Sequence, residues 1–197
     1  MHIPRNSVRA ALAALALCAM PSFSWAQQTG GGGGGGGSHA AGLQFGQVWP
    51  AGKIGEGVDG SIAPGLFYEF SASQIFALQV NLIRSSHNDR LSVFTTAAGI
   101  RANLTFFDRL VPYAAGGVGL YFVNRKTVLA PIEDVDTTNF GLYLGLGADL
   151  DLSDAFFMGL ALNLHNLFSA NAITATGRQE ENSGRWSSLF IRAGMRF

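Results

Sequence analysis

The stretch FGLYLGLGADL, residues 140–150, alternates strictly between large apolar residues and small or polar ones. The apolar set takes every second position from Phe140 to Leu150, and the other set runs between them from Gly141 to Asp149. Successive side chains of a β-strand point to opposite faces, so this period of two predicts a strand with one greasy and one small, polar face. Residues 156–165 and 188–197 repeat the pattern, and period two dominates from Gly42 onward.

The composition of the two faces separates two kinds of all-β protein. Of the 197 residues, 48% are hydrophobic and 13% are charged, against roughly 25% charge in ordinary soluble domains. A soluble sandwich or barrel keeps its aliphatic side chains inside and shows charged residues to water. The second face here carries glycine, alanine, asparagine and few charges, which is too little to coat a water-facing surface. A membrane barrel inverts the arrangement, because its greasy face meets lipid and its small polar face fills the lumen.

The period-two segments number eight, which is an even number, as expected for such a barrel. We therefore predict an all-β, eight-stranded, antiparallel, up-and-down transmembrane β-barrel over residues 42–197. The expected strands are 42–49, 61–70, 75–85, 91–106, 111–124, 138–150, 155–168 and 186–197. Short and mostly longer connections alternate between them. Since outer-membrane barrels have short periplasmic turns and longer external loops, we expect the outer membrane as location, with both termini periplasmic.

The N-terminal residues predict export. Arg5 and Arg9 precede an apolar run that ends near Met20, and small residues stand at positions 24 and 26, so residues 1–26 are interpreted as a signal peptide cleaved after Ala26. The run is too short for a spanning helix, and the leucine before Cys18 disfavours a lipoprotein. Cleavage removes the only cysteine and leaves 11 basic and 13 acidic residues, a charge of −2. Residues 27–41, with eight consecutive glycines, are predicted to form a flexible periplasmic spacer.

Aromatic residues gather near the two ends of the expected strands. This is typical of the girdles that flank the lipid-facing band of a membrane barrel. Near the short connections the set is Phe70, Phe76, Phe106, Tyr113, Phe156 and Phe197, and near the long ones it is Trp49, Phe94, Phe122, Phe140, Phe168 and Trp186.

Three stretches resemble the small outer-membrane barrels of the OmpA/OmpW-like family. VPYAAGGVGLY (111–121) is similar to the family's Pro-Tyr strand, GLGADLD (145–151) to its penultimate hairpin, and AGMRF (193–197) to its terminal strand. The resemblance covers about residues 42–197. It implies that Phe197 is an assembly signal read by the barrel-assembly machinery, and it specifies no substrate.

The inward face carries five charges, all on the short-turn halves of their strands: Glu69, Arg101, Asp149, Arg192 and Arg196. Unpaired charge in a narrow lumen is unfavourable, so we expect the carboxylates to pair with the arginines in a network that plugs the periplasmic half. A sharper hypothesis is a gate below an upper half lined by small residues. The predicted function is accordingly structural, or a narrow passive channel for small solutes, apolar ones included.

An enzyme is the least favoured class. Some barrels of this size resemble lipid A deacylases, which place a serine two residues after a strand histidine. Here Leu167 occupies that position after His165, Ser169 is four residues away, and Glu180 and Glu181 lie in a loop. We therefore predict no catalytic residues, no metal at the scattered histidines 39, 87 and 165, no cofactor, and, with balanced charge, no nucleic-acid partner.

The long connections carry charges of both signs, which suits contact with outer-membrane lipid, lipopolysaccharide and its bridging cations. The alternative is therefore a surface receptor or adhesion barrel that acts through its external loops, and deletion of residues 125–137 would test it.

Overall fold

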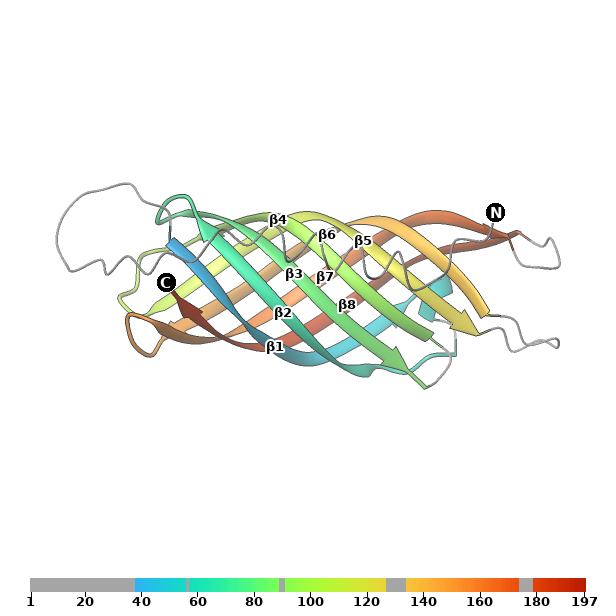
Figure 1. The fold of residues 1–197 in the computed structure, drawn as a ribbon, viewed down its shortest axis with the longest axis horizontal. Helices are drawn as coiled ribbons and strands as arrows, with labels where there is room; N and C mark the ends of the chain where they lie inside the picture. Colours follow the sequence, from blue (N-terminus) through green and yellow to red (C-terminus); the bar gives the residue numbers. More distant parts are fainter. Residues whose placement is uncertain (1–37, 56, 89–90, 127–133, 174–178) are drawn as a thin grey trace. The chain divides into compact units, whose positions relative to one another are not determined.

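The computed structural model describes residues 38–55, 57–88, 91–126, 134–173 and 179–197, apart from the side chains of 134–135 and 169–182. Eight strands account for nearly all of them (Figure 1). In chain order they are β1 Ser38–Ala51, β2 Ser61–Ser71, β3 Phe76–His87, β4 Leu91–Asn103, β5 Leu110–Lys126, β6 Asp134–Asp151, β7 Phe156–Ile173 and β8 Gln179–Arg196. A short 3-10 turn, η1 (Lys53–Gly55), follows β1.

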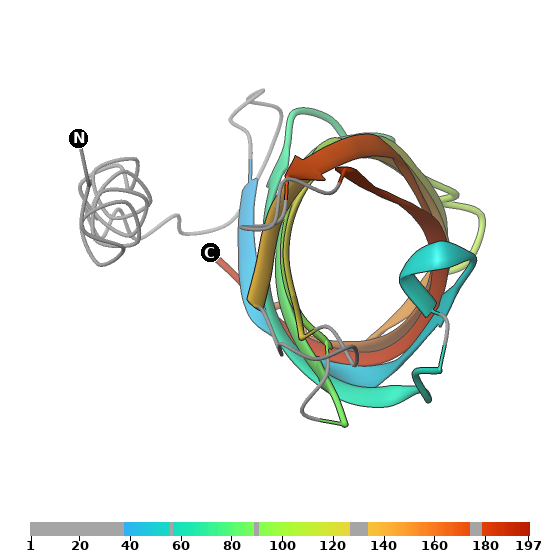
Figure 2. The same ribbon diagram turned by 90° about the vertical axis from the view of Figure 1, so that its right-hand side faces the viewer.

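The strands form one closed barrel. Each pairs antiparallel with the next in the chain, and β8 returns to β1, with Ala40 opposite Arg196. Figure 2 looks along the barrel and shows the complete ring. The predicted eight-stranded up-and-down barrel is confirmed. Among the described residues, no helix is long and apolar enough to cross a membrane.

The two ends of the barrel differ. The connections at residues 72–75, 104–109 and 152–155 lie at one end, together with the start of β1 and the end of β8, on the left of Figure 1. We call this the short-turn end, and the opposite one, which carries η1, the long-loop end.

Several strand limits differ from the expected ones. β1 begins at Ser38 rather than residue 42, because the backbone of His39 exchanges hydrogen bonds of 3.0 and 2.9 Å with Phe197 across the closing seam. β4 ends at Asn103, three residues early. β6, β7 and β8 extend beyond the expected limits at the long-loop end, since backbone pairing continues where the hydrophobic alternation stops. The signal peptide and residues 27–37 lie outside the described residues.

The alternation sorts side chains as expected, with large aliphatic residues on the outer wall. Leu144, for example, is 68% exposed, while its neighbour Tyr143 is buried in the lumen. The two girdles need one correction each: Tyr113 and Trp186 are 4% and 5% exposed and point inward. Both occupy positions of their strands whose side chains point into the lumen. The alternation along a strand sets the direction of a side chain, whether or not the residue lies near the end of the strand.

Candidate functional site in the barrel lumen

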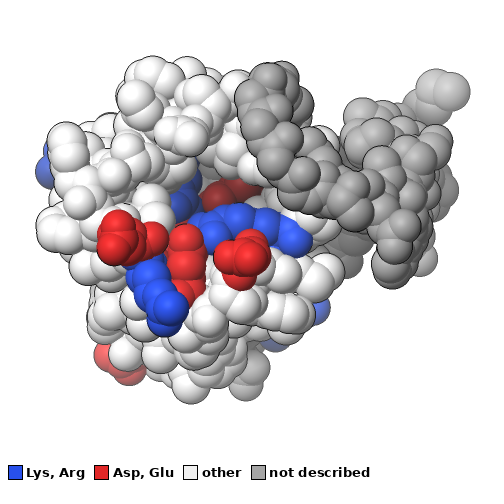
Figure 3. Space-filling view, turned by 90° about the vertical axis from the view of Figure 1, so that its left-hand side faces the viewer, with Lys and Arg blue, Asp and Glu red and all other residues white. Residues whose placement is uncertain are grey.

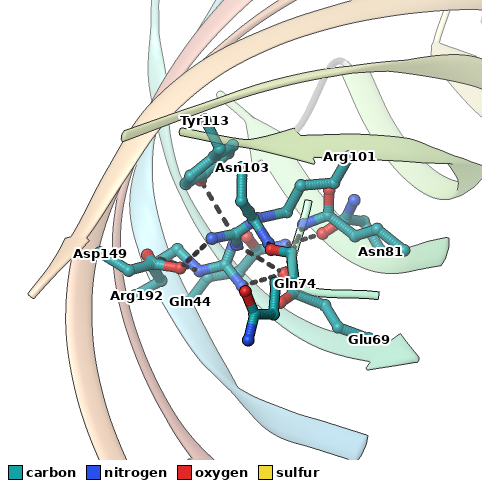
Figure 4. Close-up of polar contacts among 10 residues, drawn as sticks. Gln44, Glu69, Gln74, Asn81, Arg101, Asn103, Tyr113, Asp149 and Arg192 are labelled. Atoms are coloured by element: carbon teal, nitrogen blue, oxygen red, sulfur yellow. Dashed lines mark hydrogen bonds and ion pairs between the residues drawn. The ribbon is translucent and has the colours of Figure 1, made fainter. Parts of the chain in front are cut away.

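Four inward charges meet in the short-turn half of the lumen (Figure 4). β2 supplies Glu69, β4 supplies Arg101, β6 supplies Asp149 and β8 supplies Arg192, so every second strand contributes one. Arg101 places Nη1 2.9 Å from Glu69 Oε1 and Nη2 2.7 Å from Asp149 Oδ2. Arg192 pairs with Glu69 and places Nε 3.5 Å from Asp149 Oδ1. We call these four residues the charge cluster.

The charge cluster is neutral and closed to water. Two guanidinium groups balance two carboxylates, and the four side chains are between 0 and 7% exposed. Breaking such a buried arrangement by removing one partner leaves an uncompensated charge. The cluster therefore depends on all four members together.

Neighbouring side chains hold the cluster in place. Gln79 donates a hydrogen bond of 3.2 Å to Glu69 Oε1, and Arg192 Nη1 donates one of 3.1 Å to the Tyr113 hydroxyl. The Arg101 guanidinium lies 3.6 Å from the centre of the Tyr113 ring, and that of Arg192 lies 3.9 Å from the centre of the Phe67 ring. Such cation–π contacts favour a charged guanidinium away from water. Cations and aromatic rings thus fill the cross-section together.

Arg196 is not a member of the cluster. Its Nη1 lies 2.8 Å from Asp151 Oδ1, and the two side chains are 29% and 25% exposed. Both residues lie at the last inward position of their strands, where solvent reaches the rim. Figure 3 views the short-turn end and shows acidic and basic side chains gathered in its mouth. The structure therefore separates a buried cluster of four from a rim pair.

The long-loop half is closed by aromatic side chains rather than by small ones. Tyr121 and His165 share a hydrogen bond of 2.9 Å, and Trp186 meets the Tyr121 ring edge-on at 5.1 Å. Tyr143 stacks against His165 at 5.8 Å. These four side chains, the aromatic layer, are at most 5% exposed. The expectation that small residues line this half is wrong, because the inward glycines leave room for these large rings.

Tyr113 shows how glycine makes room for a lumen ring. It faces Gly147 on the neighbouring strand. A Cβ on Gly147 would lie 2.3 Å from Tyr113 Cζ. A side chain at this position would therefore displace the ring that carries both guanidinium contacts.

Phe67, Trp186 and Ile54 are among the contributors to the closed lumen that the sequence analysis does not identify. Phe67 and Trp186 lie on inward positions, a parity that would have identified them. Ile54 of η1 is fully buried in the core cluster at the long-loop end, and no periodic signal marks it. Figure 2 shows η1 at the rim of the barrel.

The histidines have packing partners in the structure. His165 lies inside the aromatic layer, with Leu167 also inward at 3% exposure. His87 Nδ1 lies 2.8 Å from the Asp59 carbonyl oxygen. No group of three or more candidate ligands for a metal occurs among the described residues. The side chains of Ser169, Glu180 and Glu181, and residues 127–133 of the expected external loop 125–137, lie outside what the structure describes.

Comparison with known proteins supports the same architecture. The model of the outer membrane protein beta-barrel domain matches residues 10–197. No curated protein matches the chain. The similar solved structures include Neisserial surface protein A, with a TM-score of 0.64 and 10% identity over 82% of this chain and 99% of that one. OprG from Pseudomonas aeruginosa is similar with a TM-score of 0.58 and 12% identity over 82% of this chain and 96% of that one. Ail, the attachment invasion locus protein of Yersinia pestis, is similar with a TM-score of 0.51 and 10% identity over 82% of this chain and 97% of that one.

Proposed function

The chain belongs to the family of outer membrane protein beta-barrel domains, and from this premise we propose that it is a structural barrel of the outer membrane with a closed lumen. The observation that carries the proposal is the charge cluster, whose side chains are at most 7% exposed. A conducting pore needs a water-lined path along its whole length. The interior of an eight-stranded barrel is so narrow that side chains can fill it.

The lumen has a second closure, independent of the first. The aromatic layer, formed by Tyr121, Tyr143, His165 and Trp186, closes the long-loop half. Opening the charge cluster alone would therefore leave the aromatic layer in place. This arrangement favours a structural role over a passive channel and over a gate at the charge cluster.

Planar-bilayer recording in concentrated KCl tests the closed lumen. We expect no stepwise conductance from the refolded wild type, and an unchanged trace for Arg192→Ala. A stable open level in the wild type would contradict the closed lumen. Steps that appear only with Arg192→Ala would support the gate instead. Heat-modifiable gel mobility of each sample verifies that the barrel is folded.

We also propose that the short-turn end faces the periplasm, as in barrels with short periplasmic turns. The predicted loss of Cys18 with the signal peptide leaves single introduced cysteines as unique labels. An impermeant maleimide should label Lys126→Cys on intact cells, and Ser153→Cys only after permeabilisation. The reverse result would invert the topology and leave the conductance test unaffected.

No catalytic role is proposed. A lipid-modifying site must present its catalytic groups to the acyl chains around the barrel, whereas the His165 ring lies inside the barrel against Tyr121 and Trp186.

A further inference from the structure

A groove of about 770 Å³ crosses the outer wall of the barrel from β5 to β8. Two parallel rows of outward side chains border it, because register places them side by side on successive strands. One row is Gly116, Leu144, Leu164 and Ser187, and the other is Val118, Leu142, Asn166 and Arg185. Four inward residues between the rows, one on each strand, form its floor: Gly117, Tyr143, His165 and Trp186.

The missing side chain of Gly116 opens the middle of the wall. A Cβ there would lie 3.3 Å from Leu144 Cδ2 and 3.6 Å from the Tyr143 carbonyl oxygen. Any larger residue would therefore project into the groove. Leu144 and Leu164, 68% and 57% exposed, border this part. This half of the groove is wholly apolar and matches a hydrocarbon chain.

The groove becomes polar toward the long-loop end. Asn166 and Arg185 are direct register partners on β7 and β8, and Ser187 is next along the strand. These three side chains offer hydrogen-bond donors on the outer wall. The Arg185 side chain is exposed and makes no ion pair or side-chain hydrogen bond with any residue that the structure describes.

Trp49 shows the depth of this polar end. It is the register partner of Ser187, faces outward and is 39% exposed. Tryptophan on the lipid side of a barrel sits at the headgroup level. Arg185 is therefore placed at the level of the lipid headgroups, and the apolar half of the groove extends from there toward the middle of the barrel.

We propose that the groove binds a phosphorylated glycolipid of the lipid A type, with one acyl chain between the two rows and a phosphate at Arg185. A guanidinium binds phosphate through two parallel hydrogen bonds, and Asn166 and Ser187 lie beside it to donate more. The choice of the outer-leaflet lipid rests on the proposed orientation, in which the long-loop end faces outward. The assignment of an anionic lipid headgroup rests on Arg185 itself.

Lipid retention measured by native mass spectrometry tests this site. The full mature chain is placed in phosphatidylcholine nanodiscs that contain a minor fraction of either diphosphoryl lipid A or phosphatidylglycerol. Arg185→Gln removes the charge, and Gly116→Val fills the apolar half of the groove. The matched control is Arg84→Gln, because Arg84 is also exposed on the outer wall, on β3, and without an ion pair among the described residues.

We expect Arg185→Gln to lower lipid A retention about fivefold, the effect of one interfacial arginine. Gly116→Val should lower it as well, and Arg84→Gln should leave it unchanged. Equal losses with both arginine variants would indicate general attraction and overturn the site, as would undiminished retention by Arg185→Gln. Stronger retention of phosphatidylglycerol than of lipid A would overturn the choice of ligand, whereas cysteine labelling tests the orientation separately.

Discussion

Replacing Arg192 by methionine should destabilise the barrel strongly. Its side chain is fully buried and pairs with Glu69 and Asp149, so the variant leaves two carboxylates in the lumen with the single guanidinium of Arg101. Removing one partner of a buried ion pair costs about 3–5 kcal/mol. Methionine retains part of the packing volume, so we expect a loss of about 4 kcal/mol in the free energy of unfolding, mostly electrostatic in origin.

The companion variant Glu69→Gln/Arg192→Met separates charge from packing. It restores neutrality, because Arg101 and Asp149 remain as a pair 2.7 Å apart. We expect it to recover at least about 2 kcal/mol relative to Arg192→Met, since a neutral replacement avoids the stranded charge. The measurement is urea unfolding in phosphatidylcholine vesicles, followed by tryptophan fluorescence. A loss below about 1 kcal/mol for the single variant, or a double variant no more stable than the single one, would refute this account of the charge cluster.

Three further changes test other features of the barrel. Gly147→Ala should destabilise it by about 2 kcal/mol in the same unfolding assay, because the new Cβ would lie 2.3 Å from Tyr113 Cζ, and Gly116→Ala on the open outer wall is the control that should change little. Arg196→Gln should cost under about 1 kcal/mol, since its ion pair is partly exposed, and a loss as large as that of Arg192→Met would contradict the separation of rim pair and cluster. Deleting Phe197 should leave refolding in detergent nearly intact, as judged by heat-modifiable mobility, while lowering the amount assembled in cells; equal effects in both assays would reject its role as an assembly signal.

The barrel itself could be predicted because its signal is local. Alternation around Leu144 and Tyr143 reports which side chains share a face, and eight such segments with a greasy outer face leave few other folds. The strand limits were less accurate at the long-loop end. There β7 and β8 continue as a paired hairpin to Ile173 and Gln179, and backbone hydrogen bonds hold the hairpin without any hydrophobic pattern.

The lumen charges show where sequence reasoning ended. The period of two identified both Arg192 and Arg196 as inward residues and placed them in the same expected charge network. Only the closed barrel separates them, since it brings Arg192 to Glu69 and leaves Arg196 at the rim with Asp151.

The sequence by itself determined that this chain forms a lipid-facing barrel and which side chains enter its lumen, because the direction of a side chain follows from its own strand. Tertiary structure decided which inward residues meet, and that Asn166 and Arg185 border one groove with Leu142. Which residues become neighbours depends on how far each of the eight strands is shifted against the next around the closed ring. No single segment of the sequence determines that shift.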